Sequence, residues 1–140
     1  MDENKAKILR VCNEVTKGTL METLEIEYVD VGPDFLKAKM PVGPKVLQPD
    51  GVLHGGATVA LAESVGSAAT YVFLNNKDNF VRGIEISANH VKSVRDGEVF
   101  ATATFSHKGR TTQLWNIRIT DSEDNLISLC KLTTIALPRK

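Results

Sequence analysis

The sequence predicts an α+β fold in which one antiparallel β-sheet covers a single long helix. The first of three supporting observations is a long apolar segment, residues 55–74, which is rich in alanine and is typical of a helix. The second is the alternation of apolar and polar residues on either side of it, the pattern of half-buried strands. The third is the length of 140 residues, which predicts a single domain over residues 1–140.

The charge balance argues against two classes of partner. The chain has 17 Lys and Arg against 17 Asp and Glu, so its formal net charge is zero. Without a basic excess there is no strong sequence-independent attraction to nucleic acid or to an anionic membrane, and we expect neither as a partner. The hydrophobic fraction of 42% and the charged fraction of 24% are ordinary for a globular protein and argue against disorder.

The N-terminus predicts a cytoplasmic chain. It begins MDENKAKILRVCNEV, with early acids and an amphipathic pattern, and does not have the basic and then apolar regions of a secretory signal. Cys12 and Cys130 belong to no CxxC motif, so we expect both to be free and reduced. The histidines, His54, His90 and His107, are too dispersed to indicate a metal site.

The residues before the long apolar segment predict a helix and a hairpin. Apolar side chains in residues 4–17 recur with the spacing of an amphipathic helix. Residues 24–28 and 35–41 both alternate, and the Gly-Pro-Asp sequence at 32–34 between them is a turn signal. Residues 42–52 are rich in Gly and Pro and predict a loop.

Four further strands are predicted after the long segment. Short breaks separate them, and Asp96-Gly97 is a strong hairpin signal, while Gly109 serves the next turn. Consecutive strands joined in this way predict an antiparallel meander in sequence order. The predicted strands are residues 81–94, 98–107, 112–120 and 126–137.

Glu63 is the anomaly of the long apolar segment. Between residues 51 and 76 it is the only acid or base apart from His54. A carboxylate near the centre and flanking strands of a soluble type argue against a membrane span. We therefore expect a core helix buried on nearly all sides, with a carboxylate that is costly to leave unpaired. Gly66 and Ser67 share its face and leave room for a ligand, although a core hydrogen bond or an Arg partner would also satisfy Glu63.

The start of this helix offers hydrogen-bond donors. Gly55 and Gly56 allow close backbone approach, and the first N–H groups of a helix have no internal partner, so they can stabilise a developing oxyanion. Gln48 could add a side-chain amide, and His54 could either orient a carbonyl group or cap the loop. A glycine pair before a helix is more often structural than catalytic, so the combination with Glu63 is what indicates a site.

Together these residues resemble a known family. The pattern Gln48-x5-His54-Gly55-Gly56-x6-Glu63-x3-Ser67 is similar to the motif of the hotdog-fold acyl-CoA thioesterases. It is closest to the branch of the 1,4-dihydroxy-2-naphthoyl-CoA and 4-hydroxybenzoyl-CoA thioesterases that carry a Glu on the helix. The similarity covers residues 23–137 and includes QPDGVLHGGATVALAESVGSAA and GIEISANHVKSVRDGEV. The resemblance implies the hotdog fold, an antiparallel β-sheet wrapped around one long central helix.

The resemblance also implies an activity. The substrate would be an aromatic acyl-CoA, such as 1,4-dihydroxy-2-naphthoyl-CoA of menaquinone biosynthesis, hydrolysed to the free acid and CoA. The Gly55 N–H and the Gln48 amide would bind the thioester carbonyl, and Glu63 would act as nucleophile or as general base. Ser67 would position the attacking water or the substrate, and His54 would complete the catalytic set. CoA is part of the substrate, and no cofactor or metal is expected.

CoA-binding residues and assembly follow from the same resemblance. Each site would lie between two protomers of a homodimer, itself usually assembled into a homotetramer. The basic side chains of the CoA-binding set could meet phosphates, or they could simply form a solvated strand edge. The set consists of Gly83, His90, Val91, Lys92, Ser93, His107, Lys108, Gly109, Arg110, Thr111 and Thr112.

The same residues bear on three alternative functions. A hotdog dehydratase or hydratase would need a His paired with a carboxylate, and the start of the helix carries no such pair. A catalytically silent module that only binds acyl-CoA would be expected to lose Glu63, which is present. A proofreading thioesterase that acts on misacylated carrier proteins has the same chemistry and a nearly identical motif, so it stays open.

Overall fold

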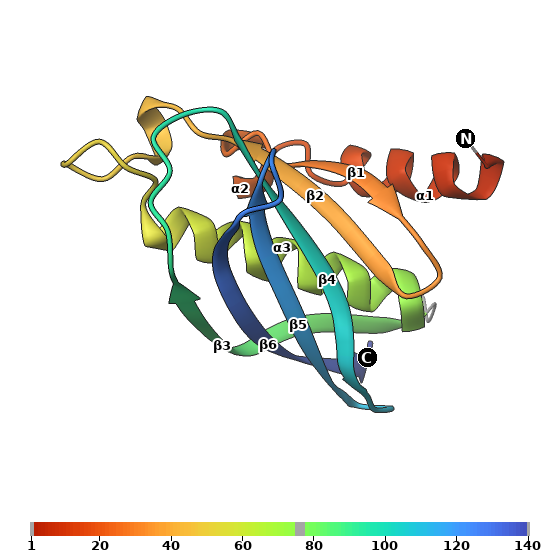
Figure 1. Ribbon diagram of the computed structural model, residues 1–140. Coiled ribbons are helices and arrows are strands. Elements are labelled where there is room, and N and C mark those ends of the chain that lie inside the picture. Colours follow the sequence, from red (N-terminus) through yellow and green to blue (C-terminus); the bar gives the residue numbers. More distant parts are fainter. Residues whose placement is uncertain (1, 75–77, 140) are drawn as a thin grey trace.

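A six-stranded antiparallel sheet wraps around one long helix in the computed structural model of the chain (Figure 1). The structure describes residues 2–74 and 78–139. Its helices are α1 (Glu3–Glu14), α2 (Leu20–Thr23) and α3 (Gly55–Leu74), with a short 3-10 turn, η1 (Pro44–Val46). Its strands are β1 (Glu27–Val31), β2 (Phe35–Pro41), β3 (Asn79–His90), β4 (Glu98–Lys108), β5 (Thr112–Asp121) and β6 (Leu126–Pro138). The predicted α+β class is confirmed.

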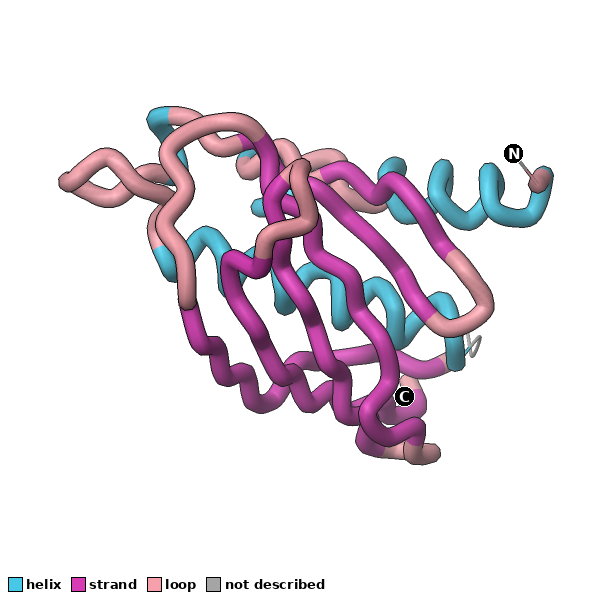
Figure 2. The backbone as a smooth tube through the Cα atoms, viewed as in Figure 1, coloured by secondary structure: helices cyan, strands magenta, loops and turns pink. Residues whose placement is uncertain are grey.

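The strand order differs from the predicted meander. Neighbouring strands follow the order β1-β2-β4-β5-β6-β3, so β3 pairs with β6 at one edge and β2 pairs with β4 (Figure 2). The hairpin predicted at Asp96-Gly97 is therefore wrong. The connection from β3 to β4 bonds instead to the segment before α3, because Val94 O accepts from Leu53 N and Gly97 O accepts from Val42 N.

Several predicted boundaries also change. The strand predicted over residues 24–28 begins only at Glu27, because α2 ends at Thr23 and Glu25 takes a left-handed conformation with φ of 58°. Residues 91–94 lie outside β3. The predicted loop 42–52 contains η1, which starts at a proline. The polar residues 75–79, which the sequence places as a break between the long apolar segment and the next strand, are described only in part, because residues 75–77 lie outside the described residues.

The helix α3 packs one face against the sheet. It contacts β2, β3, β4, β5 and β6 through residues that are buried along one side. These are Thr58, Leu61, Ala62, Val65, Gly66, Ala69 and Thr70. The closest approach is at Gly66, where a methyl group would overlap Leu132 Cδ2. The opposite face, which carries Glu63, is only half buried, so the prediction of burial on nearly all sides is wrong for the single chain.

The helix α3 is apolar along most of its length. It is the one helix of the described residues that is long and apolar enough to cross a membrane by length and composition. The central helix of a soluble protein passes the same test. The packing of α3 against the concave side of the sheet accounts for its apolar character (Figure 2).

A buried polar network ties α3 to the sheet. Trp115 Nε1 donates to Thr70 Oγ1 at 2.8 Å, and the hydroxyl oxygens of Thr70 and Thr134 lie 3.0 Å apart. Thr134 donates to Gln113 Oε1 at 2.9 Å, and Gln113 Nε2 donates to Gly109 O at 3.1 Å. These four side chains are all at most 1% exposed. The network therefore joins α3, β5 and β6 to the turn that follows β4.

Replacing Thr70 by Val is expected to destabilise the fold without leaving a cavity. The change keeps the shape but removes the acceptor of the Trp115 N–H, and an unsatisfied buried donor costs about 1–3 kcal/mol. Urea unfolding followed by tryptophan fluorescence measures the loss. The matched control is Thr102→Val on β4, where the side chain is half buried and makes no hydrogen bond with the described residues. Equal effects of the two substitutions would contradict the role of the network.

Candidate active site

The carboxylate of Glu63 lies against β3 at Gly83, a residue without a side chain. A methyl group on residue 83 would stand 2.5 Å from Glu63 Oε2, so only glycine leaves the carboxylate its place. Glu63 is partly exposed and forms no hydrogen bond or ion pair with the described residues. Gly83, which the resemblance assigned to CoA binding, is thus a direct neighbour of the predicted catalytic carboxylate.

Glu63 also borders a large cavity. This cavity, which we call the α1–α3 groove, has a volume of about 1120 Å³ and lies between α1, α2 and α3. Apolar side chains dominate its wall, and Lys7 is the one cation in it. The wall includes Ile8, Val11, Cys12, Val15, Leu20, Met21, Tyr28, Ala60, Ser64, Ser67, Ala68, Tyr71 and Val72. The groove therefore offers Glu63 and Ser67 to an apolar ligand.

The first N–H groups of α3 differ in whether they have a hydrogen-bond acceptor. His54 Nδ1 accepts from Gly56 N at 2.8 Å, while His54 O accepts from the N–H groups of Ala57 and Thr58. The Gly55 N–H has no acceptor among the described residues. The sequence allows His54 either to orient a carbonyl group or to cap the loop, and the hydrogen bond from Gly56 N to its Nδ1 is a cap. The Gly55 N–H is the donor left for a ligand.

The second cavity lies at this helix start, and we call it the helix-start cavity. Its volume is about 360 Å³, and it brings Gln48 and Gly55 together with residues 90–93. A tight turn holds Gln48 there, because its N–H donates to Val52 O and its carbonyl accepts from Gly51, whose φ is +82°. The predicted oxyanion donors and one predicted CoA-binding segment therefore line the same cavity.

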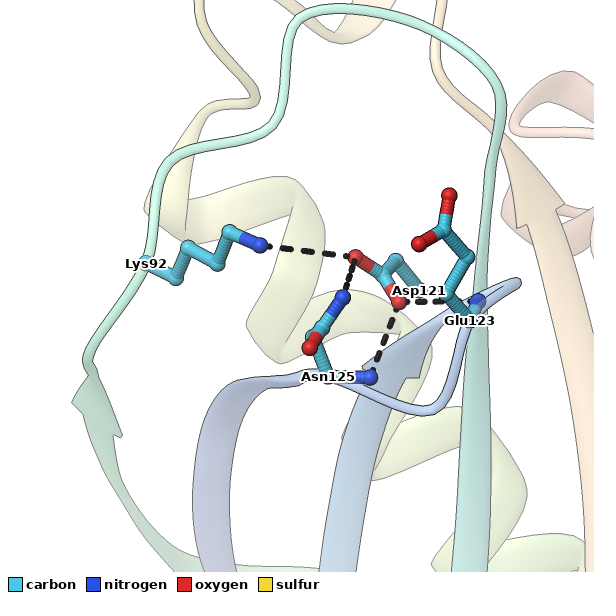
Figure 3. Close-up of polar contacts among 4 residues, drawn as sticks. All are labelled: Lys92, Asp121, Glu123 and Asn125. Carbon is cyan, nitrogen blue, oxygen red and sulfur yellow. Dashed lines mark hydrogen bonds and ion pairs between the residues drawn. The ribbon is translucent and has the colours of Figure 1, made fainter.

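Lys92 in that segment is already engaged. Its Nζ lies 3.7 Å from Asp121 Oδ2, and the same carboxylate accepts from the backbone N–H groups of Glu123 and Asn125 and from the Asn125 side-chain amide (Figure 3). The Asn125 backbone and side-chain donors are the main cause that holds the pKa of Asp121 below its usual 3.8, with Lys92 a smaller one. The ion pair ties residues 91–94 to the turn between β5 and β6.

The other predicted CoA-binding segment, residues 107–112, spans the end of β4, the turn at residues 109–111 and the first residue of β5. Gln113 Nε2 holds its Gly109 carbonyl, and Ala136 N donates to Thr111 O. Lys108 Nζ lies 5.4 Å from the centre of the Phe105 ring. His107, Lys108 and Arg110 are exposed, but no residue of this turn lines either cavity.

The predicted site residues thus form two separate groups in one chain. Gly55 and Glu63 are eight residues apart on α3, about 12 Å along its axis. The two predicted CoA-binding segments are also far apart. His90 of one pairs with Ser128, and Thr112 of the other pairs with Ile135. Ser128 and Ile135 are seven residues apart on β6, or about 24 Å. One carbonyl group cannot contact both the helix-start cavity and Glu63 of the same chain.

Some features of the site had no clear sequence signal. The α1–α3 groove depends on α2, which was not predicted, and on Val15, which the helical pattern placed on the buried face but which is 65% exposed. Gly83 gave no sign of its contact with Glu63, because the bulge of β3 at residues 83–85 follows only from the strand pairing. Within residues 2–74 and 78–139, no group of three or more His, Cys, Asp or Glu side chains could hold a metal ion.

Comparisons with known proteins give a consistent answer. The model of the Thioesterase superfamily matches residues 50–128. The chain is 42% identical over 134 residues to the 1,4-dihydroxy-2-naphthoyl-CoA hydrolase of Escherichia coli K12, covering 95% of this chain and 98% of that one. It is 42% identical over 130 residues to the proofreading thioesterase EntH of Cronobacter turicensis, covering 92% and 93%. A solved structure of a mutant thioesterase PA1618 from Pseudomonas aeruginosa matches with a TM-score of 0.90 at 36% identity, covering 94% of each chain.

Replacing Gly83 by Ala is expected to displace the Glu63 carboxylate. The new methyl group would overlap Oε2, and a shift of about 1 Å at a catalytic group can lower the rate by about 10²-fold. Hydrolysis of an acyl-CoA, followed by release of free thiol, measures the effect. Gly43→Ala is the control, because a methyl group there meets no atom within 4 Å. Full activity of the Gly83 variant would contradict the proposed contact.

The Asp121 cluster predicts a dependence of stability on pH. Because the folded-state pKa of Asp121 lies below its usual 3.8, the carboxylate stabilises the fold above pH 3.8, and this contribution disappears as the pH falls through the folded value. We expect Asp121→Asn to destabilise the chain at neutral pH and the difference from the wild type to shrink in acid. Urea unfolding at neutral pH and in acid, with Glu123→Gln as the control, tests this. A difference in stability that is independent of pH would refute it.

Proposed function

The chain belongs to the thioesterase superfamily, and we propose that it hydrolyses an aromatic acyl-CoA, such as 1,4-dihydroxy-2-naphthoyl-CoA, to the free acid and CoA. The family and the hotdog fold make it a thioester hydrolase. The aromatic substrate draws support from the 42% identity to the hydrolase of that compound. With that substrate the chain would act in the cytoplasm, in menaquinone biosynthesis.

One observation carries the proposal. Glu63, the only acid of α3, lies unpaired among the described residues at the rim of an apolar groove, where Gly83 leaves its carboxylate free to approach a substrate. An unpaired carboxylate that lines an apolar cavity is a candidate functional group, because no ion pair or hydrogen bond with the described residues gives it a structural role. The groove accommodates an apolar acyl group next to this carboxylate.

The distance between Gly55 and Glu63 supports a site formed by two chains. β3 is an edge strand of twelve residues, and its outer side has no partner strand among the described residues. Such an edge is ready to pair with a second copy. Gly55 lies beside His90, and Glu63 lies beside Gly83. An antiparallel β3–β3 pair that sets His90 opposite the partner's Gly83 would therefore bring Gly55 of one chain close to Glu63 of the other.

The same register accounts for the other predicted residues. Arg82 and Thr112 both pair with Ile135, so the turn at residues 107–112 lies beyond Gly83 along the sheet. Across the proposed two-fold axis this turn would lie beside residues 91–93 of the partner chain. Both predicted CoA-binding segments would then flank one site. We propose a homodimer of this kind as the functional unit, with a homotetramer formed by two such dimers.

The proposed mechanism uses the groups that the two chains supply. The thioester carbonyl accepts from the Gly55 N–H and from the Gln48 amide, which stabilise the oxyanion as it forms. The partner's Glu63 either attacks the carbonyl carbon to give a mixed anhydride or removes a proton from an attacking water. In both routes the C–S bond breaks and the CoA thiolate leaves. Ser67, one turn further along the groove, positions the water that completes hydrolysis.

A second candidate is a proofreading thioesterase that acts on misacylated carrier proteins. The chain is as similar to such an enzyme as to the naphthoyl-CoA hydrolase, 42% identical to each. The chemistry is the same in both cases, and only the carrier of the thioester differs. Comparing one acyl group on CoA and on a carrier protein distinguishes the two candidates.

Replacing Glu63 by Gln is expected to abolish hydrolysis while the fold stays intact. The amide has nearly the same shape but can neither attack nor take a proton, so kcat should fall by at least about 10²–10³-fold. A thiol-release assay on benzoyl, hydroxybenzoyl, dihydroxynaphthoyl, phenylacetyl and medium-chain acyl-CoA measures it. Fatty acyl turnover above aromatic turnover would overturn the aromatic assignment. No turnover on CoA or carrier-protein thioesters by the wild type, with CoA still bound, would indicate a silent binding module.

The two-chain site predicts that inactive variants complement each other. A chain with Glu63→Gln and a chain with Gln48→Ala are each expected to be nearly inactive. After mixing under conditions that exchange subunits, about half of the dimers are mixed, and each mixed dimer has one site with neither substitution. We therefore expect about one quarter of the wild-type activity to return. A mixture as inactive as its components would argue for sites within single chains.

A further inference from the structure

A buried serine holds the imidazole of His90 at the helix-start cavity. His90 on β3 and Ser128 on β6 are directly paired residues of the sheet. His90 Nδ1 lies 2.9 Å from Ser128 Oγ. The Ser128 residue is 0% exposed, whereas His90 is exposed and lines the cavity together with Gln48 and Gly55.

The protons of this pair can be assigned from their neighbours. Ser128 has a single hydroxyl proton, and its Oγ lies 3.2 Å from Asn89 O, a carbonyl oxygen that can only accept. When the hydroxyl donates to Asn89 O, Ser128 Oγ must accept from His90, so the ring carries a proton on Nδ1. The Cys130 thiol, 3.5 Å from Ser128 Oγ, is a weak further partner. With the hydroxyl proton assigned to Asn89 O in this way, a neutral His90 has its lone pair on Nε2.

The other side of the ring packs on the start of α3. A methyl group on Gly55 would lie 2.9 Å from His90 Nε2 and 3.1 Å from its Cδ2. The ring is thus fixed from two directions, by the hydrogen bond to Ser128 and by the backbone of Gly55. Its Nε2 stands next to residue Gly55, whose N–H has no acceptor among the described residues.

We propose that Ser128 is a positioning residue that presents His90 Nε2 as the acceptor for an amide N–H in the thiol part of the substrate. The inference rests on the proposed function, in which the Gly55 N–H binds the thioester carbonyl. In CoA, and in the same prosthetic group on a carrier protein, the nearest amide is two methylenes from the sulfur. A carbonyl on Gly55 would leave this amide beside His90, where a neutral imidazole with Nδ1 protonated can accept its N–H.

The first test determines which ring nitrogen of His90 carries the proton. Nitrogen NMR of the imidazole, at a pH where the ring is neutral, should find Nδ1 protonated in the wild type. In Ser128→Ala the ring loses its acceptor at Nδ1 and becomes free to carry the proton on Nε2. Ser122→Ala, an exposed serine in the turn between β5 and β6, is the control and should leave the signals unchanged. A His90 with its proton on Nε2 in the wild type, or the same tautomer in Ser128→Ala, would overturn the proposal.

The second test separates binding of the amide from general damage. One aromatic acyl group is presented as its N-acetylcysteamine thioester, which contains the amide, and as a butanethiol thioester, which lacks it. Ser128→Ala is expected to raise KM for the first about tenfold, with kcat within twofold, and to leave the second unchanged. His90→Ala should behave similarly, and adding Ser128→Ala to it should have no further effect. An equal rise in KM for both thioesters would overturn the proposal.

Failure of the proposed function can be distinguished from failure of this inference. If the wild type hydrolyses neither thioester, the proposed function fails, and titration with N-acetylcysteamine decides the inference. A shift of the His90 Nε2 resonance in the wild type that is absent in Ser128→Ala would support it. No shift in the wild type would overturn it.

Discussion

The depth at which α3 lies against the sheet is the constraint on which the rest of the structure depends. Gly66 lets the helix backbone approach Leu132 and Ile117 more closely than any side chain would allow. At this depth Thr70, one turn further on, comes within hydrogen-bond distance of Trp115 and Thr134. A methyl group at Gly66 would push the helix outward and separate these partners, at a cost in both packing and hydrogen bonding.

The same contact determines what the helix shows on its far side. Since one face of α3 is occupied by the sheet, Glu63 and Ser67 point toward the α1–α3 groove. Glu63 still reaches β3, but only because residue 83 has no side chain. The two glycines therefore have complementary effects, since Gly66 sets the position of the helix and Gly83 leaves room for its carboxylate. Together they place a charged group beside an apolar cavity without a partner among the described residues.

Much of the fold could be predicted because local patterns were strong. The bounds of α3 and β2 agree with the predicted 55–74 and 35–41, since both elements have clear periodicity and clear ends. The strand order could not be predicted, because the choice of β6 as the partner of β3 is made by long-range packing. The helix α2 was missed because four residues carry too little periodic signal.

The candidate site was only partly accessible to sequence reasoning for a similar reason. Residue types and spacing singled out Gln48, Gly55 and Glu63, but spacing alone cannot tell which chain supplies each of them. The sequence is compatible with Lys92 either as a ligand for phosphate or on a solvated strand edge, and its ion pair with Asp121 depends on a turn that is distant in sequence. Ser128 gave one overlooked signal, a polar residue that alternation places on the buried side of a strand.

The open edge of β3 also affects a single chain that is not paired with a second copy. A single copy presents twelve residues of strand, with Ile84 56% exposed at their centre, to any extended peptide nearby. Backbone hydrogen bonding does not discriminate between sequences, so a newly made or dissociated chain is exposed to aggregation and to non-native strand addition. In the proposed homodimer, the supply of the second subunit, rather than the stability of the single fold, would then set how much of the protein stays folded and active at low concentration. Dilution would favour these non-native pairings, because it separates the subunits.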